Sequence, residues 1–239
     1  MNLKNQIAVV TGSTKGIGLA VAEALAEEGA HVAVCSRNSD EVQACVEDLS
    51  ARFEGRILGR QCDVREASEF ESLLDFAESE LGGLDILINN AGIGIFKPVG
   101  EMTVEEWRSV LSTNLDSLFY GCRFAIPKMK RRGGGFIINI GSLAGKNAFP
   151  DGAAYNASKF GLIGFSEALM QEVRHDDIRV AYVMPGSVDT WFRGGSPQGR
   201  GSWKLSAQDV AEVVVQTLKR SDRCLTSRIE MRPAKPPKK

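Results

Sequence analysis

The sequence predicts an α/β fold in which one doubly wound parallel sheet of about seven strands carries helices on both faces. Two observations lead to this prediction. Short apolar runs rich in β-branched residues alternate along the chain with longer segments of helical periodicity, which is the pattern of βαβ units. The apolar runs are nearly continuous, which is typical of strands buried on both faces. Because no composition shift, repeat or linker divides them, we expect residues 1–231 to form a single domain.

The individual elements follow from these two kinds of segment. The predicted strands are the short apolar runs at 6–11, 31–35, 57–62, 84–89, 135–140, 178–183 and 228–231. The predicted helices fill the segments between them, at 16–28, 39–53, 66–81, 104–131, 152–174 and 207–219. Gly29 stands where the first helix needs a left-handed C-cap, and Ser206 stands where the last helix needs an N-cap.

Two segments are predicted to be irregular. Residues 193–203 are rich in glycine and should form a mobile loop. Residues 232–239 are rich in proline and lysine, and we expect them to be a solvated, disordered end instead of a membrane- or partner-binding tail.

The composition excludes several classes of protein. The chain of 239 residues is 43% hydrophobic and 25% charged, with 29 basic and 30 acidic residues and a formal net charge of −1. It is therefore neither disordered by composition nor basic enough to bind nucleic acid through phosphate contacts in general. Its longest purely apolar stretches, such as residues 7–10 and 136–138, are far below the ~20 residues of a membrane-spanning helix. We expect neither nucleic acid nor a membrane as a partner.

The cysteines and the N-terminus indicate a cytoplasmic protein. The five cysteines are odd in number and contain no C-x-x-C pair, so neither a disulfide framework nor a metal site is expected. The first residues are polar and lead directly into a strand, which leaves no room for a secretory signal.

A glycine-rich turn follows the first predicted strand and opens the first predicted helix. Its glycines are Gly12, Gly16 and Gly18, in the spacing G-x3-G-x-G. Glycines let the backbone approach a pyrophosphate, and the N–H groups of a helix N-terminus face the negative charge. In this position the turn predicts a nucleotide site and a Rossmann-type fold.

A tyrosine and a lysine share one face of the helix predicted at 152–174. Tyr155 and Lys159 lie four residues apart and are therefore neighbours on the helix surface. An ordinary tyrosine has a pKa of about 10, and a neighbouring ammonium favours its phenolate form, which suits a general acid or base. Ser142 follows the strand predicted at 135–140, at the sheet edge where parallel sheets bind ligands, and its hydroxyl could donate to a substrate oxygen.

These motifs, together with Asn89-Asn90-Ala91-Gly92, Asn114 and Pro185-Gly186, occur in an order and spacing that resemble the short-chain dehydrogenase/reductase family over about residues 5–190. The chain is similar to the shorter type of that family, and most to 3-oxoacyl-[acyl-carrier-protein] reductases and related carbonyl reductases. The resemblance implies interconversion of a carbonyl and an alcohol with a nicotinamide cofactor. It also implies a homo-oligomer, a dimer or tetramer built on the helices at 104–131 and 152–174. Residues Leu111, Leu115, Leu118 and Phe119 could supply an apolar face for it.

The same resemblance implies a role for each residue. Tyr155 would protonate the carbonyl oxygen, Ser142 would orient and polarise it, and Lys159 would hold the ribose hydroxyls and lower the tyrosine pKa, while Asn114 would anchor a water leading to Lys159. The remaining residues would contact the cofactor: Gly12, Gly16, Ile17 and Gly18 at the pyrophosphate; Asp63 and Val64 at the adenine; Asn90, Ala91 and Gly92 at the adenosine and ribose; Pro185, Gly186, Val188 and Thr190 at the nicotinamide amide and phosphate. Ser13, in the glycine turn, is also expected to contact the cofactor.

The end of the second predicted strand indicates which cofactor is used. NAD-dependent relatives carry an acidic residue there, whereas this chain has Ser36 followed by Arg37. Arg37 and Lys15 could both bind a 2′-phosphate, so we expect NADP(H).

Two alternatives stay open: an NAD-linked alcohol or sugar dehydrogenase, and a cofactor-binding protein without turnover, which the presence of Ser142, Tyr155 and Lys159 argues against. The substrate is a small carbonyl compound or alcohol whose identity the sequence does not give. Its expected pocket wall is apolar and aromatic: Ile93, Ile95, Phe96, Leu143, Phe149, Trp191, Phe192 and Trp203.

Overall fold

A computed structural model describes residues 1–193, 197–199 and 202–237 of the chain. Its centre is one seven-stranded sheet in the order β3-β2-β1-β4-β5-β6-β7, with every neighbouring pair parallel. The strands are β1 (Ile7–Thr11), β2 (His31–Ser36), β3 (Ile57–Gln61), β4 (Ile86–Asn89), β5 (Gly135–Ile140), β6 (Ile178–Pro185) and β7 (Arg228–Met231). Each strand lies within two residues of its predicted bounds.

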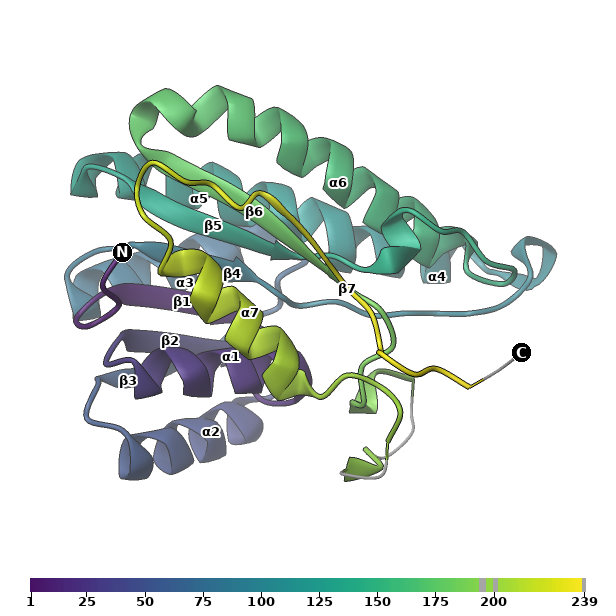
Figure 1. Cartoon of the computed structure of the whole chain (residues 1–239), viewed down its shortest axis with the longest axis horizontal. Helices are drawn as coiled ribbons and strands as arrows, with labels where there is room; N and C mark the ends of the chain where they lie inside the picture. The colour runs from purple at the N-terminus through teal and green to yellow at the C-terminus, as the bar shows by residue number, and fades with distance from the viewer. Residues whose placement is uncertain (194–196, 200–201, 238–239) are drawn as a thin grey trace.

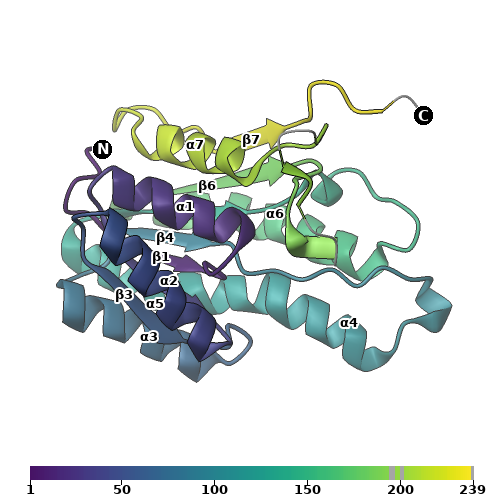
Figure 2. The ribbon, with the colours of Figure 1, turned by 90° about the horizontal axis from the view of Figure 1, so that it is seen from below.

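Helices cover both faces of the sheet (Figures 1 and 2). One layer consists of α1 (Gly16–Glu27), α2 (Ser39–Arg52) and α7 (Ala207–Leu218). The other consists of α3 (Ala67–Leu81), α5 (Ser117–Arg132) and α6 (Ala153–Val173), with α4 (Val104–Leu111) leading into α5. The predicted doubly wound sheet is therefore confirmed.

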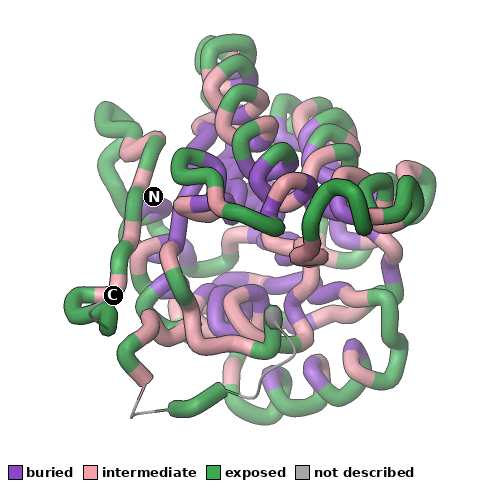
Figure 3. The backbone as a smooth tube through the Cα atoms, turned by 90° about the vertical axis from the view of Figure 1, so that its right-hand side faces the viewer, coloured by how far each residue is buried: buried purple, intermediate pink, exposed green. Residues whose placement is uncertain are grey.

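Two apolar cores form because successive side chains of a strand point to opposite faces. In β1, Val10 packs under α1, α2 and α7, whereas Val9 packs under α3, α5 and α6. The same division holds in β4, where Ile88 joins the first core and Leu87 joins the second. All four side chains are completely buried. Figure 3 shows the buried residues gathered in the sheet and on the helix sides that face it.

The predicted helix ends are also found. Gly29 has φ +82°, the left-handed conformation expected after α1. Ser206 caps α7, because its hydroxyl accepts a hydrogen bond from the Asp209 N–H at 3.1 Å. Among the described residues, no helix is long and apolar enough to cross a membrane.

The segment 104–131, predicted as one continuous helix, is interrupted in the structure. A π-helical segment, Ser112–Asp116, separates α4 from α5. Such π segments often occur at functional sites, because the extra residue redirects side chains. Here the segment carries Asn114, which is buried. The expected mobile loop at 193–203 lies partly outside the described residues, as do the last two residues of the 232–239 tail.

Candidate active site

A cleft of about 600 Å³ opens at the carboxyl ends of the strands. Residues that follow β1, β2, β3, β4, β5 and β6 all line it. The strand order reverses between β1 and β4, and in open parallel sheets such a reversal is where ligands bind. The topology therefore brings together the segments that the sequence motifs singled out.

The glycine turn forms one end of this cleft. Gly12 and Gly16 both have φ +61°, a conformation that L side chains rarely adopt. A Cβ at Gly18 would lie 2.2 Å from the Gly12 carbonyl oxygen, so a side chain there would collide with the turn. No side chain that the structure describes caps the N-terminus of α1, which leaves its first N–H groups available to an anion from the cleft.

The segment after β4 is tied to this turn. Asn90 Nδ2 donates to the carbonyl oxygens of Thr11 at 2.8 Å and Gly12 at 3.0 Å. In return, Thr11 Oγ1 accepts from the N–H groups of Asn90 and Ala91, each at 3.0 Å. Asn90, Ala91 and Gly92 line the cleft, and the Asn90 side chain also fixes the shape of the glycine turn.

Two residues that were expected to contact the cofactor, Ser13 and Gly18, do not line the cleft. Ser13 is completely buried; its hydroxyl donates to the Val10 carbonyl at 2.8 Å and accepts from the Cys35 N–H at 2.9 Å. Its backbone N–H donates to the Cys35 carbonyl, so Ser13 holds β1 to β2 and the expected cofactor contact is not supported. Gly18 is also absent from the cleft lining, and its place is the close contact between α1 and the turn.

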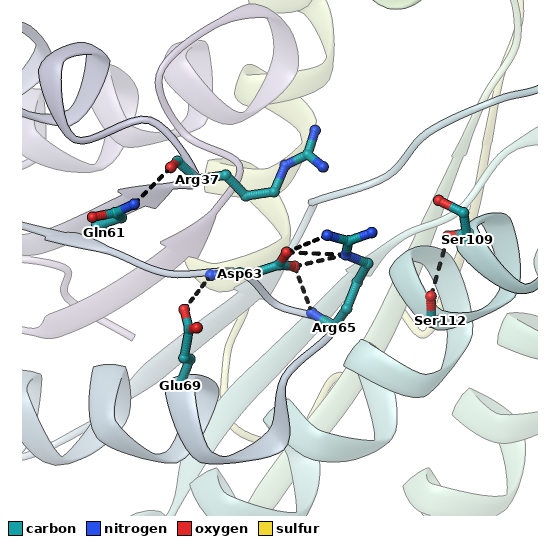
Figure 4. A network of polar contacts seen from close by, with 7 residues as sticks. All are labelled: Arg37, Gln61, Asp63, Arg65, Glu69, Ser109 and Ser112. Atoms are coloured by element: carbon teal, nitrogen blue, oxygen red, sulfur yellow. Dashed lines mark hydrogen bonds and ion pairs between the residues drawn. The ribbon is translucent and has the colours of Figure 1, made fainter. Parts of the chain in front are cut away.

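Two cations line the cleft, Arg37 directly after β2 and Lys15 in the glycine turn before α1. The Arg37 guanidinium makes no hydrogen bond or ion pair with any residue that the structure describes, while Gln61 Nε2 donates to the Arg37 carbonyl at 3.0 Å and fixes its backbone (Figure 4). Lys15, in contrast, has a counter-charge, because its Nζ lies 3.4 Å from Glu41 Oε1. No carboxylate stands at the Ser36 position, but Glu41 lines the same cleft.

Asp63 follows β3 and is neutralised by a neighbour. Arg65 Nε donates to both carboxylate oxygens of Asp63, at 2.9 and 3.0 Å, and the Asp63 N–H donates to Glu69 Oε2 at 2.8 Å (Figure 4). The hydrogen bonds from Arg65 hold the pKa of Asp63 below its usual value. Asp63, Val64 and Arg65 all line the cleft. The two charges of this wall, on Asp63 and Arg65, form an ion pair with each other.

Asn114 lies behind the cleft wall, outside its lining. Its Oδ1 accepts from the Ile93 N–H at 2.8 Å, and its Nδ2 donates to the Ile93 carbonyl at 2.9 Å and to Ser158 Oγ at 3.0 Å. A Cβ at Gly92 would lie 3.3 Å from Asn114 Oδ1 and 3.8 Å from Lys159 Nζ. The Asn114 side chain therefore joins the segment after β4 to α6, close to Lys159.

Lys159 and Tyr155 meet on α6 as their spacing predicts. Lys159 Nζ lies 5.8 Å from the centre of the Tyr155 ring and donates to the Ile140 carbonyl at 3.0 Å. The lysine is buried, and desolvation lowers its pKa to about 8. Ser142 lines the same cleft; its hydroxyl accepts from the Ala144 N–H at 3.1 Å. The structure thus brings a phenol, a hydroxyl and a buried amine to one wall.

Aromatic rings surround Tyr155. The Phe96 and Phe192 rings each lie 5.5 Å from the Tyr155 ring, and Phe149 lies 5.9 Å from Phe96. Of the other residues expected in this wall, Ile93 and Trp191 line the cleft. Ile95, Phe96, Leu143, Phe149 and Trp203 are not among its lining residues; Phe96 contacts the Tyr155 ring from behind the lining.

The sequence did not predict several polar and charged side chains of the cleft. Thr14, Glu41 and Arg65 all line the cleft. The Asp63-x-Arg65 spacing was a usable signal for Arg65, because two residues of a turn can pair within a loop. No local sequence pattern predicts the place of Glu41, because Thr14 and Lys15, which it contacts, lie 27 and 26 residues away in the sequence.

Known proteins resemble this chain in sequence and in structure. Residues 6–200 match the family model described as short chain dehydrogenase. The chain is 37% identical over 184 residues to the D-beta-hydroxybutyrate dehydrogenase of Rhizobium meliloti (strain 1021), covering 77% of this chain and 71% of that enzyme. It is 39% identical over 191 residues to the NADP-dependent (R)-specific alcohol dehydrogenase of Lentilactobacillus kefiri, covering 79% and 75%.

Among solved structures, a metagenomic short-chain oxidoreductase in complex with NADP superimposes with a TM-score of 0.86 at 33% identity, covering 99% of this chain and all of that one. The motifs, the sheet order and the arrangement of the cleft agree with these similarities. We conclude that the chain belongs to the short-chain dehydrogenase/reductase family of oxidoreductases.

Proposed function

We propose that this protein is a carbonyl reductase that uses NADPH to convert a carbonyl group into a secondary alcohol. The observation that carries the choice of cofactor is Arg37, which directly follows the Ser36 position where NAD-dependent proteins place an acid, and whose guanidinium makes no hydrogen bond or ion pair with a described residue. Two similar proteins, the alcohol dehydrogenase of Lentilactobacillus kefiri and the metagenomic oxidoreductase, are described with NADP.

The residues of the cleft fit a dinucleotide. The glycine turn has no room for side chains, and the uncapped start of α1 offers N–H groups to a pyrophosphate. Gly12, Gly16 and Ile17 would hold that pyrophosphate. The adenosine half would lie against Asp63, Val64, Asn90, Ala91 and Gly92, and the nicotinamide half against Pro185, Gly186, Val188 and Thr190. When bound, NADPH supplies the hydride.

Residues of α6 and of the segment after β5 would supply the proton and stabilise the charge that it leaves. Tyr155 would donate its phenolic proton to the carbonyl oxygen as that oxygen gains negative charge, and Ser142 would donate a hydrogen bond to the same oxygen. Lys159, beside the ring, would hold the ribose hydroxyls and stabilise the phenolate that is left. Asn114 would act as a positioning residue, because its side chain is engaged by Ile93 and Ser158.

The aromatic surroundings of Tyr155 favour an apolar carbonyl substrate. Phe96, Phe149 and Phe192 form a connected group of rings beside Tyr155. A 3-oxoacyl thioester is one candidate, and an aryl ketone is another that the rings would contact directly.

We further propose a cytoplasmic homo-oligomer. Trp107 on α4, Phe119 on α5 and Phe160 on α6 have exposed aromatic side chains, which an interface would cover. Leu118, which we expected in that interface, is instead buried in the core. All five cysteines are free thiols, in keeping with a reducing compartment. Sedimentation at micromolar concentration should show a dimer or tetramer, and a monomer alone would contradict this proposal.

Kinetics with both cofactors test the proposed cofactor. At a fixed carbonyl substrate, NADPH should give a kcat/KM about ten- to a hundredfold above that of NADH, because a charge-assisted hydrogen bond contributes ~1.5–3 kcal/mol. Arg37→Ala should remove most of this preference. Arg56→Ala is the control, since Arg56 precedes β3 at the opposite end of the sheet and binds the Glu80 carbonyl. Equal efficiency of the parent with both cofactors would contradict the proposed cofactor, and a preference for NADH would support an NAD-linked alcohol or sugar dehydrogenase.

A further inference from the structure

We infer that Glu41 is a specificity-determining residue that weakens the binding of NADPH relative to NADH. This inference deepens the proposed function and rests on its assignment of the adenosine half of the cleft. Glu41 lies in the first turn of α2 and lines the same cleft as Gly12, Lys15 and Arg37. No motif assigns it a role.

Two contacts fix the Glu41 carboxylate beside the glycine turn. Thr14 Oγ1 donates to Glu41 Oε2 at 2.9 Å, and Lys15 Nζ lies 3.4 Å from Glu41 Oε1. The start of α2 is itself held, because Asn38 Oδ1 accepts from the N–H groups of Asp40 at 2.9 Å and Glu41 at 3.3 Å. The carboxylate is therefore anchored from both the helix and the turn.

These contacts set the charge that a 2′-phosphate would meet. Of the two cations that line this part of the cleft, Lys15 already forms an ion pair with Glu41, whereas the Arg37 guanidinium forms no hydrogen bond or ion pair with a described residue. A 2′-phosphate must share Lys15 with the carboxylate and is repelled by it, since a phosphate monoester carries about −1.5 to −2 charges near neutral pH. NADH brings a neutral hydroxyl to this position and meets no such repulsion.

The expected effect is modest because the pair is partly solvated. The Lys15 and Glu41 side chains are 61% and 41% exposed, and exposed charges interact weakly and are screened by salt. Replacing the carboxylate by an amide should therefore raise the ratio of NADPH affinity to NADH affinity by about two- to fivefold at low salt, and by less at high salt.

The test compares two acidic residues of the same helical turn. Dissociation constants for NADPH and NADH, measured by nicotinamide fluorescence without substrate, are determined for the parent, Glu41→Gln and Asp40→Asn. Asp40 is exposed and is not among the cleft-lining residues, so Asp40→Asn matches the loss of charge from the start of α2. We expect the ratio to rise in Glu41→Gln and to stay at the parent value in Asp40→Asn. The rise should come from tighter binding of NADPH, and a gain in NADPH affinity cannot come from misfolding.

A second pair of variants tests the part played by Lys15. Once the Glu41 carboxylate is replaced, Lys15 is free to bind the phosphate. Lys15→Ala should therefore reduce the ratio of NADPH affinity to NADH affinity more in the Glu41→Gln background than in the parent. A ratio that is unchanged or lower in Glu41→Gln would overturn the inference, even if the parent prefers NADPH as proposed. A parent without NADPH preference that gains one in Glu41→Gln would support the inference and contradict the proposed cofactor.

Discussion

The Lys159 ammonium lies 5.8 Å from the centre of the Tyr155 ring while its Nζ donates to the Ile140 carbonyl, the last residue of β5. The strand that carries the buried core thus fixes the amine, and the amine lies beside the phenol. Because both side chains project from α6 one turn apart, the helix spacing and the strand end together determine the geometry of the proposed proton donor.

The buried lysine makes stability depend on pH. The folded-state pKa of Lys159 is about 8, against 10.5 for the ordinary side chain. Between these two pH values the unfolded chain binds more protons, so the free energy of unfolding rises with pH across that window, by roughly 3 kcal/mol from this group. Below pH 8 both states are protonated and the cost of burying the charge is fully present.

Lys159→Met isolates this contribution, since other groups titrate equally in both proteins. Urea unfolding of cofactor-free protein at pH 7 and at pH 10 should show the parent gaining stability relative to the variant as the pH rises. Parallel pH profiles would mean that the lysine is not desolvated in the folded protein.

Loss of the Ser142 hydroxyl should slow turnover without preventing it. Ser142→Ala should lower kcat by about a hundred- to a thousandfold, because removal of one donor to a developing oxyanion costs ~2.7–4 kcal/mol. Cofactor affinity should change little. Ser109→Ala, which alters a serine of α4 outside the cleft lining, serves as the control. A parent-like kcat in Ser142→Ala would remove this residue from the mechanism.

A methyl group at Gly18 should damage the phosphate turn. Gly18→Ala would place its Cβ 2.2 Å from the Gly12 carbonyl oxygen, and such overpacking costs ~1–3 kcal/mol of stability. The affinity of the Gly18→Ala variant for NADPH should fall at least about tenfold, because the shifted turn no longer fits the pyrophosphate. Gly164→Ala in α6 is the matched control: no atom lies within 4 Å of its Cβ, and the change should stabilise the helix by ~0.5–1 kcal/mol. Equal effects of the two substitutions would contradict the close contact between α1 and the turn.

The rings around Tyr155 should discriminate between substrates of equal size. Acetophenone should be reduced with a kcat/KM about two- to tenfold above that of cyclohexyl methyl ketone, because an aromatic pair contributes ~0.5–1.5 kcal/mol beyond its area. Phe96→Leu should narrow the difference. Phe53→Leu, at the end of α2 beneath Arg52, should leave it unchanged. A preference for the saturated ketone in the parent would rule out a ring-lined substrate site.

The sheet could be predicted because each of its strands is marked by a short run of neighbouring residues in the sequence. Runs such as residues 86–88 and 136–138 are apolar throughout, and such runs belong to strands covered on both faces. The positions of Tyr155 and Lys159 followed from the helix period alone.

The surroundings of several site residues could not be predicted, because they depend on contacts between distant segments. Ser13 follows Gly12 in the turn, yet its hydroxyl is used between β1 and β2. The π segment at Asn114 is accompanied by side-chain hydrogen bonds to Ile93 and Ser158, which lie 21 and 44 residues away. The pairing of Lys15 with Glu41 likewise requires α2 to pack beside the turn.

Reductase activity of Tyr155→Phe tests the proposed function most directly, because the change removes the phenolic proton while keeping the ring that packs on Phe96 and Phe192. The measurement follows NADPH absorbance with a panel of carbonyl compounds that includes the best substrate of the parent, alongside NADPH binding by fluorescence. We expect turnover to be lost and the dissociation constant for NADPH to stay within a few-fold of the parent value. Activity above about a tenth of the parent, with the same substrate and intact binding, would contradict the assignment of Tyr155 as the proton donor.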